Sequence, residues 1–372
     1  THTDEDLFLG FKASSHETLK ETYNDKYEYI LPDIVLDKNL FSSNKYGNAD
    51  FTSNLKVHNY DTNKFTKFLV NDVDWKSTSF GYKSGPTGKM LGKLKNVNYE
   101  AKNSSDYKSD TTGELFGAFG FLSEIDMYKE SKNDFKQFLT PKLLVRYAPG
   151  QMRKQEIDKG TRLNHHNIFS LDRLNSYNNF ETGLSATIGF DYEIKNNDKK
   201  FDLIIGQVVN EMENKNMPSS SSLDEKLSDL VGSSNLEVNK NIKFNYNFAV
   251  DQNYNRLNYN EIGTTVDLNP IKFNFNYLRE MEHIGDQEYI TGKLDLINTD
   301  KGIFSAETKR NLITNSAEFY NLSYEYLNDC LKAGLVYRRE FYDDSELEAE
   351  NSLMFKITLI PFGNINSPSF NE

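Results

Sequence analysis

The sequence predicts an all-β protein, a large antiparallel transmembrane β-barrel of the outer membrane. Segments of about ten residues alternate apolar with polar residues and are separated by short polar turns. In one of them Ile242, Phe244, Tyr246, Phe248 and Val250 are apolar, while Lys243, Asn245 and Asn247 between them are polar. Because successive side chains of a strand point to opposite faces, each segment has one apolar and one wet face. A tilted strand of about 9–11 residues crosses the hydrocarbon core of a bilayer.

The composition supports the same class. The 372 residues are only 37% hydrophobic yet 13% aromatic, with 26 Phe and 22 Tyr, and the mean hydropathy is −0.68. Disordered chains are poor in aromatic residues, so disorder does not explain the low hydropathy. A barrel needs apolar residues only at alternate positions, with tyrosines at the membrane interfaces. The chain contains no apolar run of about 18 residues, so a closed barrel is the structure that lipid permits.

The strand candidates number about seventeen at intervals typical of all-β proteins. The clearest are 181–193, 201–210, 228–238, 242–250, 258–268, 271–281, 289–297, 302–310, 319–327, 331–341 and 351–360; less regular ones lie near 26–36, 48–58, 65–76, 89–101, 113–128 and 138–147. An odd count conflicts with the even number of single-chain bacterial barrels. Either one strand assignment is wrong or strands are missing at the N-terminus, in which case these strands are part of a larger barrel.

The connections after residue 193 alternate between short turns and longer loops. In outer-membrane barrels the short turns lie in the periplasm and the long loops outside. The sequence therefore predicts that the last strand descends toward the periplasm. The stretch 148–179 has no alternation, and we expect it to be a long extracellular loop.

The chain contains no motif for catalysis or cofactor binding. There is no nucleophile elbow, no phosphate-binding glycine loop and no Cys-x-x-Cys. His165 and His166 have no pattern of further ligands around them, so we expect a polar loop pair and no metal site. The net charge of −12 argues against nucleic acid as a partner. We expect no enzyme activity and no cofactor.

Two features are candidate sites. Cys330 is the single cysteine, so it is either a free thiol or half of a disulfide to a cysteine outside this sequence. Of the neighbours Arg338 and Arg339, one faces the lumen and the other faces out, since they are adjacent in a strand. Arg339 lies near the outer rim, where it either contacts lipid headgroups or extends its charged end into water.

Several segments together resemble the C-terminal barrel of the LptD family, outer-membrane proteins that insert lipopolysaccharide into the outer leaflet. They are Asn71 to Trp75, Thr140 to Lys142, Arg146 to Pro149, Phe169 to Leu174, Leu223 to Gly232, Tyr324 to Cys330, Gly334 to Arg339, Leu353 to Leu359 and Pro361 to Gly363. The resemblance extends in this order over most of the chain.

The resemblance implies a mechanism without chemistry. Proteins of this family receive lipopolysaccharide from a periplasmic Lpt bridge through a jellyroll domain, and an LptE-type lipoprotein plugs their barrel. Lipopolysaccharide leaves through a lateral seam between the first and last barrel strands. The last strand would be Asn351 to Ile360, with Leu353, Phe355, Ile357 and Leu359 as its apolar residues. On this reading residues 1–372 are the C-terminal barrel domain, without a signal sequence or jellyroll, and Cys330 pairs with a cysteine of the jellyroll.

The expected partners are therefore lipopolysaccharide, the lipoprotein plug, the Lpt bridge and outer-membrane lipids. The alternative function is a porin-like or receptor barrel that passes small solutes. A porin has a constricted, water-filled pore, whereas a barrel of this family has a wide lumen filled by a partner. A third class, a soluble or surface-attached β adhesin, would bury its apolar faces against each other.

Overall fold

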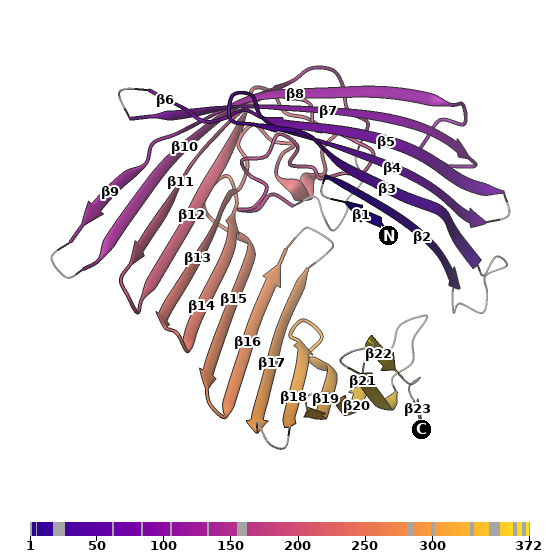
Figure 1. Ribbon diagram of the computed structural model, residues 1–372, viewed down its shortest axis with the longest axis vertical. Helices are drawn as coiled ribbons and strands as arrows, with labels where there is room; N and C mark the ends of the chain where they lie inside the picture. Colours follow the sequence, from indigo (N-terminus) through magenta and orange to yellow (C-terminus); the bar gives the residue numbers. More distant parts are fainter. Residues whose placement is uncertain are drawn as a thin grey trace. The chain divides into compact units, whose positions relative to one another are not determined.

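The computed structural model describes residues 2–371 except for 5, 18–26, 62, 83–84, 105, 132–133, 155–161, 282–285, 299–301, 328–330, 342–349, 360–362 and 367–369, with the backbone alone at 61, 298, 358–359, 363–366 and 370–371. The regular structure of this part is almost entirely β (Figure 1). Its one short 3-10 helix is Ser219–Ser221. No helix within the described residues is long and apolar enough to span a membrane.

The described part of the chain has 23 strands. They are β1 His2–Asp4, β2 Leu7–Glu17, β3 Tyr27–Ser43, β4 Gly47–Asp61, β5 Lys64–Lys76, β6 Phe80–Gly81, β7 Thr87–Lys102, β8 Thr112–Glu124, β9 Met127–Glu130, β10 Lys136–Ala148, β11 Gly183–Lys195, β12 Lys200–Asn210, β13 Leu230–Asn239, β14 Ile242–Val250, β15 Leu257–Leu268, β16 Ile271–Glu280, β17 Gln287–Asn298, β18 Gly302–Asn311, β19 Ser316–Leu327, β20 Leu331–Glu340, β21 Asn351–Leu359, β22 Gly363–Asn366 and β23 Phe370–Asn371.

The strand prediction was correct for the strands from β11 to β21 and incomplete elsewhere. All seventeen predicted segments contain a strand, although several boundaries differ by up to seven residues at one end. The six additional strands are β1, β2, β6, β9, β22 and β23. Five of these are at most four residues long, too short to display an alternation. The sixth, β2, begins with the run Leu7-Phe8-Leu9, which hides its period of two.

The chain divides into two compact units. The N-terminal unit comprises Thr1–Tyr128, Phe138–Asp191 and Ile204–Val231, and the C-terminal unit comprises Lys129–Gln137, Tyr192–Leu203 and Gly232–Glu372. In the N-terminal unit, β2 pairs with β1 and β3, and pairing continues through β4, β5, β7, β8 and β10, each antiparallel to the last.

In the C-terminal unit, each strand from β14 to β21 pairs antiparallel with the next one in sequence. The register aligns apolar side chains into rows that cross the strands. One row is Phe273, Leu294, Ala306, Leu322, Tyr337 and Leu353. A second is Ile271, Leu296, Phe304, Tyr324, Leu335 and Phe355. We call the face that carries them the apolar face.

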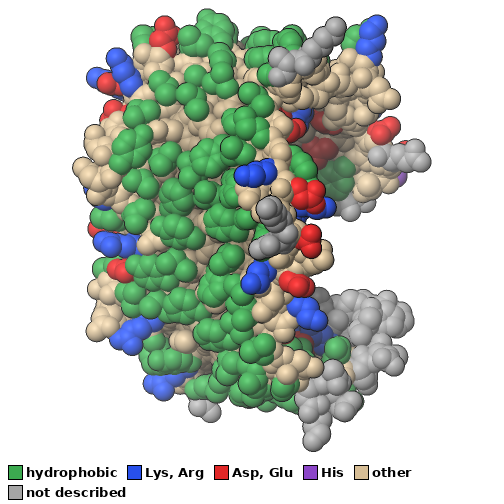
Figure 2. Space-filling model, turned by 90° about the vertical axis from the view of Figure 1, so that its left-hand side faces the viewer, with side chains coloured by type: hydrophobic (Ala, Val, Ile, Leu, Met, Phe, Trp, Pro, Cys, Tyr) green, Lys and Arg blue, Asp and Glu red, His purple; other side chains and the backbone are tan. Residues whose placement is uncertain are grey.

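The apolar face is exposed. Every member of the second row retains 42–46% of its accessible surface, although all six are large and hydrophobic. Figure 2, which faces the left-hand side of Figure 1, shows hydrophobic side chains gathered in a broad field over the strands on that side, with charged side chains mostly at its borders. A contiguous exposed field of this kind marks a surface that contacts an apolar partner, and alternation along each strand is the pattern of a lipid-facing sheet.

The turns have local causes in the sequence. The Asn239 side-chain oxygen accepts hydrogen bonds from the backbone N–H groups of Asn241 and Ile242, at 2.8 and 2.9 Å, between β13 and β14. At the opposite ends of the strands, Asp251 Oδ1 accepts from Asn255 and Arg256 in the connection to β15. Asn and Asp favour turns because their side chains bond the backbone a few residues on.

An added positive charge should destabilise the protein much more on the apolar face than on the polar face. Leu322→Arg places a cation in the middle of β19 on the apolar face and should lower the free energy of unfolding in phospholipid vesicles by about 2–4 kcal/mol. Ser323→Arg, one residue further along on the other face, is the control and should change it by less than about 1 kcal/mol. Equal losses in urea titrations of the two variants would contradict the assignment of the faces.

Candidate functional site

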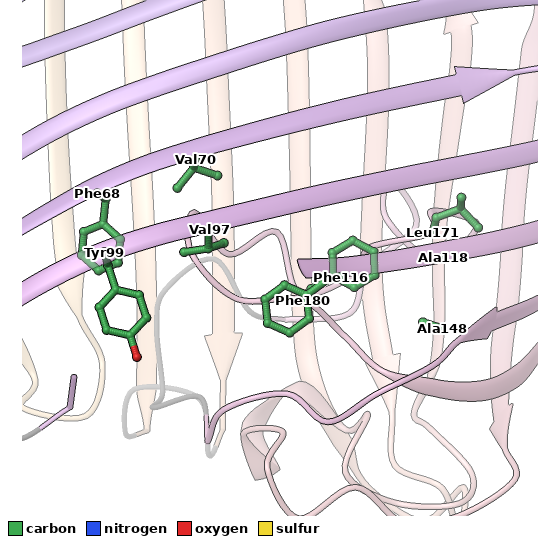
Figure 3. Packing of buried hydrophobic residues seen from close by; sticks show 9 residues of the cluster. All are labelled: Phe68, Val70, Val97, Tyr99, Phe116, Ala118, Ala148, Leu171 and Phe180. Carbon is green, nitrogen blue, oxygen red and sulfur yellow. The ribbon is translucent and has the colours of Figure 1, made fainter. Parts of the chain in front are cut away.

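The long connection between β10 and β11 packs onto one face of the N-terminal unit. Phe68 and Val70 of β5, Val97 and Tyr99 of β7, and Phe116 and Ala118 of β8 form a buried cluster with Ala148, Leu171 and Phe180 (Figure 3). Leu171 and Phe180 belong to the connection. Leu69 and Leu115, which are adjacent in sequence to Phe68 and Phe116, point to the opposite face and are exposed, and the same is true of Leu94 of β7, three residues before Val97. The connection therefore covers the face turned away from the exposed apolar side chains.

A buried ion network ties this connection to β10 and β11. Arg173 of the connection is fully buried and binds the Glu181 carboxylate through Nη2 and, at 2.9 Å, through Nε. Its guanidinium also donates to Ser185 Oγ at 2.9 Å and to Thr187 Oγ1 at 3.3 Å on β11. Arg146 of β10 lies 3.6 Å from Glu181 and donates to the Leu171 carbonyl at 2.5 Å. One carboxylate is thus shared by two buried guanidinium groups.

A second anchor joins the connection to β7. Lys95, which is 4% exposed, donates from Nζ to the Ser176 carbonyl at 2.6 Å and lies 3.7 Å from the Asp172 carboxylate and 3.9 Å from that of Asp72. Arg153 binds Glu114 of β8 at 3.3 Å. The described residues of the expected loop over 148–179 are largely packed against the sheet, because apolar and charged side chains both find partners there. The side of the membrane on which this loop lies stays a prediction.

Burial and neighbouring positive charges shift the pKa values of Glu181 and Asp172 in opposite directions. Burial alone would raise the pKa of Glu181, but Arg146 and Arg173 hold the pKa of that carboxyl below its ordinary value. Burial raises the pKa of Asp172, and Lys95 only partly opposes this. Glu181 therefore stabilises the fold at pH values above its ordinary pKa of 4.5, and this stabilisation is lost as the pH falls through the lowered value. Asp172 has the opposite sign and favours folding at low pH.

A second connection, 211–229, packs beside the first. Asn214 Nδ2 lies 3.3 Å from the Met152 sulfur, and Asn216 Nδ2 donates to the Met152 carbonyl at 3.1 Å. With the ends of β10, β11 and β12 these connections surround a pocket of about 490 Å³ whose lining includes Asn210, Glu211 and Glu213. The packing of both connections was missed by the sequence analysis. The signal present was the spacing of three between Ile168, Leu171 and Leu174, all buried.

The polar face of the C-terminal unit carries the residues that alternate with the apolar rows. One row across it is Asn274, Lys293, Glu307, Asn321, Arg338 and Ser352. Arg338 Nε lies 2.5 Å from Glu340 Oε1. Lys309 on the same face binds Glu318 at 3.0 Å. Charged side chains on this face are the mark of a water-facing surface.

The predicted site residues fall on both faces as follows. Arg338 lies on the polar face opposite Asn321, whereas Arg339 lies on the apolar face opposite Tyr320. Leu353, Phe355 and Ile357 all point to the apolar face, opposite Tyr337, Leu335 and Ala333. Leu359 belongs to β21, but its side chain is not described, and Cys330 lies outside the described residues.

The sequence analysis expected β21 to be the last strand of the sheet, but β22 and β23 follow it in the chain. The edge of β21 away from β20 pairs with β22 from Lys356 to Leu359 and with β23 at Ser352 and Leu353. These pairings cover part of an edge of β21 that would otherwise be unpaired. β21 is thus capped by short segments of its own chain.

The rings of His165 and His166 lie 3.8 Å apart, and within the described residues no group of three or more His, Cys, Asp or Glu is arranged to hold a metal ion.

Antiparallel strands with one exposed apolar face and one polar face define the class: this is an integral β-barrel protein of the outer membrane. The family model of LPS transport system D, LptD, matches residues 9–299. The chain belongs to the LptD family, whose members are transport proteins of lipopolysaccharide.

One solved structure agrees with this chain in fold. The siderophore receptor PirA from Acinetobacter baumannii superimposes with a TM-score of 0.53 at 8% identity, over 95% of this chain and 69% of that one. A mutant of the Rh. blastica porin matches with a TM-score of 0.31 at 11% identity, over 74% of this chain and 86% of that one. No curated protein sequence matches the chain. The first likeness supports the fold of an outer-membrane barrel and carries nothing about substrate.

Replacement of Glu181 should loosen the connection. Glu181→Gln leaves two buried guanidinium groups without a counter-charge and should destabilise the protein by about 3–5 kcal/mol, measured by urea unfolding at pH 7 and by protease cleavage within 149–182. Glu114→Gln is the control: its pair with Arg153 is partly exposed and should cost less than about 1 kcal/mol. Wild-type protease resistance in Glu181→Gln would contradict the role of this carboxylate.

Proposed function

We propose that this protein inserts lipopolysaccharide into the outer leaflet of the outer membrane, and that the lipid leaves sideways at the terminal strands of the sheet. Membership of the LptD family is the observation that carries the proposal. The two faces of the C-terminal unit fit such a route, since an amphiphile needs a water-facing surface for its sugars and an apolar surface for its acyl chains. No step requires chemistry, and the outer membrane supplies no nucleotide.

The seam is proposed at the edge of β21. A ladder of backbone hydrogen bonds holds a sheet together in lipid, so the place with the fewest such bonds opens at the lowest cost. β20 pairs with β21 over nine residues, whereas β22 pairs with it over four and β23 over two. Detachment of β22 and β23 would expose the β21 edge, with Leu353, Phe355 and Ile357 beside the passing acyl chains.

Two partners are proposed with it. An LptE-type lipoprotein would fill the space on the polar face of the C-terminal unit, where the row from Asn274 to Ser352 offers amide and charged groups; a photo-crosslinker at Asn321 would trap it. The Lpt bridge would deliver lipopolysaccharide through a jellyroll, to which Cys330 would be disulfide-bonded. A change in the mobility of the full-length protein on reduction, lost in Cys330→Ser, would reveal that bond.

Depletion of the full-length protein in its host tests the function. Newly made lipopolysaccharide should stop reaching the outer leaflet and accumulate inside, because no other route crosses the outer membrane in this proposal. The measurement is the accessibility of pulse-labelled lipopolysaccharide to a modifying enzyme at the cell surface. Unchanged surface lipopolysaccharide together with reduced uptake of a small solute would favour the channel alternative.

The seam has its own test in the same strain. In a Cys330→Ser background, Ile357→Cys with Ile365→Cys should form a disulfide between β21 and β22, because the two residues are directly paired and paired Cα atoms lie about 4.5–5.5 Å apart. We expect the oxidised variant to block delivery of lipopolysaccharide and the reduced variant to restore it.

The matched control shares one of these cysteines. Ala333→Cys with Ile357→Cys joins β20 to β21, a pair that the seam keeps together. This disulfide should leave delivery unchanged in both redox states. Normal delivery with the β21–β22 disulfide intact would exclude this edge from the route.

A further inference from the structure

Three arginines occupy the same place in three strands of the C-terminal unit. Arg279, Arg310 and Arg339 are the penultimate residues of β16, β18 and β20. These strands run in the same direction, since each is separated from the next by one antiparallel strand. All three arginines therefore lie at the end of the sheet where the longer connections lie, the end expected to be extracellular.

The three side chains point to the apolar face. Arg279 continues the series Ile271, Phe273, Phe275 and Tyr277 along β16 at a spacing of two. Arg310 is paired with Ile290, and Arg339 with Tyr320. All three are exposed. We call them the arginine row: it lies at the border where the apolar face meets the loops, the depth at which lipid headgroups lie.

Two of the guanidinium groups are positioned by uncharged neighbours. Arg310 Nη2 donates to Asn315 Oδ1 at 2.6 Å, and the Arg339 guanidinium lies 4.8 Å from the centre of the Phe341 ring. Phe341 in turn packs edge-on against Tyr320, with the ring centres 5.3 Å apart. Within the part of the chain that the structure describes, none of the three forms a salt bridge. Glu288 lies directly opposite Arg279 in the ladder and accepts a hydrogen bond from the Tyr277 hydroxyl at 2.7 Å. Arg310 and Arg339 have no acid opposite them in the ladder, so their charge is available to an external anion.

The row is confined to the strands that lead to β21. At the penultimate positions of β10 and β12 the residues are Tyr147 and Val209, both exposed.

Neighbouring arginines of the row are two strands apart, about 10 Å. Arg279 is opposite Glu288 and Arg310 is opposite Ile290, so the two arginines are offset by two residues along β17. Arginine binds phosphate through two parallel N–H groups, and this spacing suits an amphiphile with more than one phosphate.

The geometry points to the arginine row as a binding surface for the phosphate groups of lipopolysaccharide, with its acyl chains against the apolar face below. Lipid A combines phosphorylated glucosamines with acyl chains, which matches cations directly above a lipid-facing surface. The inference rests on the proposed function for the identity of the lipid that passes beside β21. The row would hold the headgroup at the outer rim as the lipid leaves the seam.

The test measures binding of lipopolysaccharide to the full-length protein in phosphatidylcholine nanodiscs. The variant R279Q/R310Q/R339Q should bind fluorescent lipopolysaccharide on the order of 100-fold more weakly, because each basic group near an anionic lipid contributes roughly a factor of five. The charge-conserving R279K/R310K/R339K should lose less, because it keeps the three positive charges and gives up only the bidentate contact. Dephosphorylated lipopolysaccharide should bind the wild type and the glutamine variant equally.

The control removes the same charge at the other end of the sheet. K243Q/K272Q/K332Q alters three lysines near the short turns and should leave binding unchanged. A loss below threefold in the arginine variant, an equal loss in the lysine control, or an equal loss for phosphatidylglycerol in place of lipopolysaccharide would overturn the inference. Failure of the transport proposal is distinguishable, because binding to the purified protein requires no delivery and delivery is read separately in the depleted strain.

Discussion

Each strand in lipid faces two demands at once: neighbouring strands must satisfy its backbone groups, and its side chains must alternate between lipid and water. The C-terminal unit meets both along the strands from β15 to β20, each of which is paired on both sides. The low hydropathy follows, since only every second residue has to be apolar. The register is equally constrained, because a slip of one residue would move Leu322 to the polar face and Asn321 into lipid.

The N-terminal unit uses its covered face differently. There the connection from β10 to β11 fills the face with side chains, including the Arg146–Glu181–Arg173 network and Lys95. Burying these charges carries a desolvation cost that their mutual attraction offsets only with good geometry. Such a network favours one arrangement of the segment, because a shift of Glu181 deprives a buried guanidinium of its carboxylate partner. The connection is thereby held to the sheet at points on β7, β8, β10 and β11.

The sequence was sufficient where periodicity was strong and insufficient where contacts are irregular. The predicted strand 242–250 coincides with β14, and the opposite faces of Arg338 and Arg339 were predicted correctly, because both depend only on the period of two. The packing of 149–182 was not predictable, since no local period records it. Nor were β22 and β23, whose pairing with β21 depends on a chain reversal. Arg279 and Arg310 became part of a site only once the register placed them in one row with Arg339.

The most direct measurement of the two-faced sheet is a scan of β19 with spin labels. In a Cys330→Ser background, single cysteines from Phe319 to Tyr326 would be labelled in phospholipid vesicles, and their collision rates with oxygen and with a water-soluble nickel complex compared. The account predicts a period of two: labels at 320, 322 and 324 meet oxygen, and labels at 321, 323 and 325 meet the nickel complex. Equal accessibility at successive positions would contradict it.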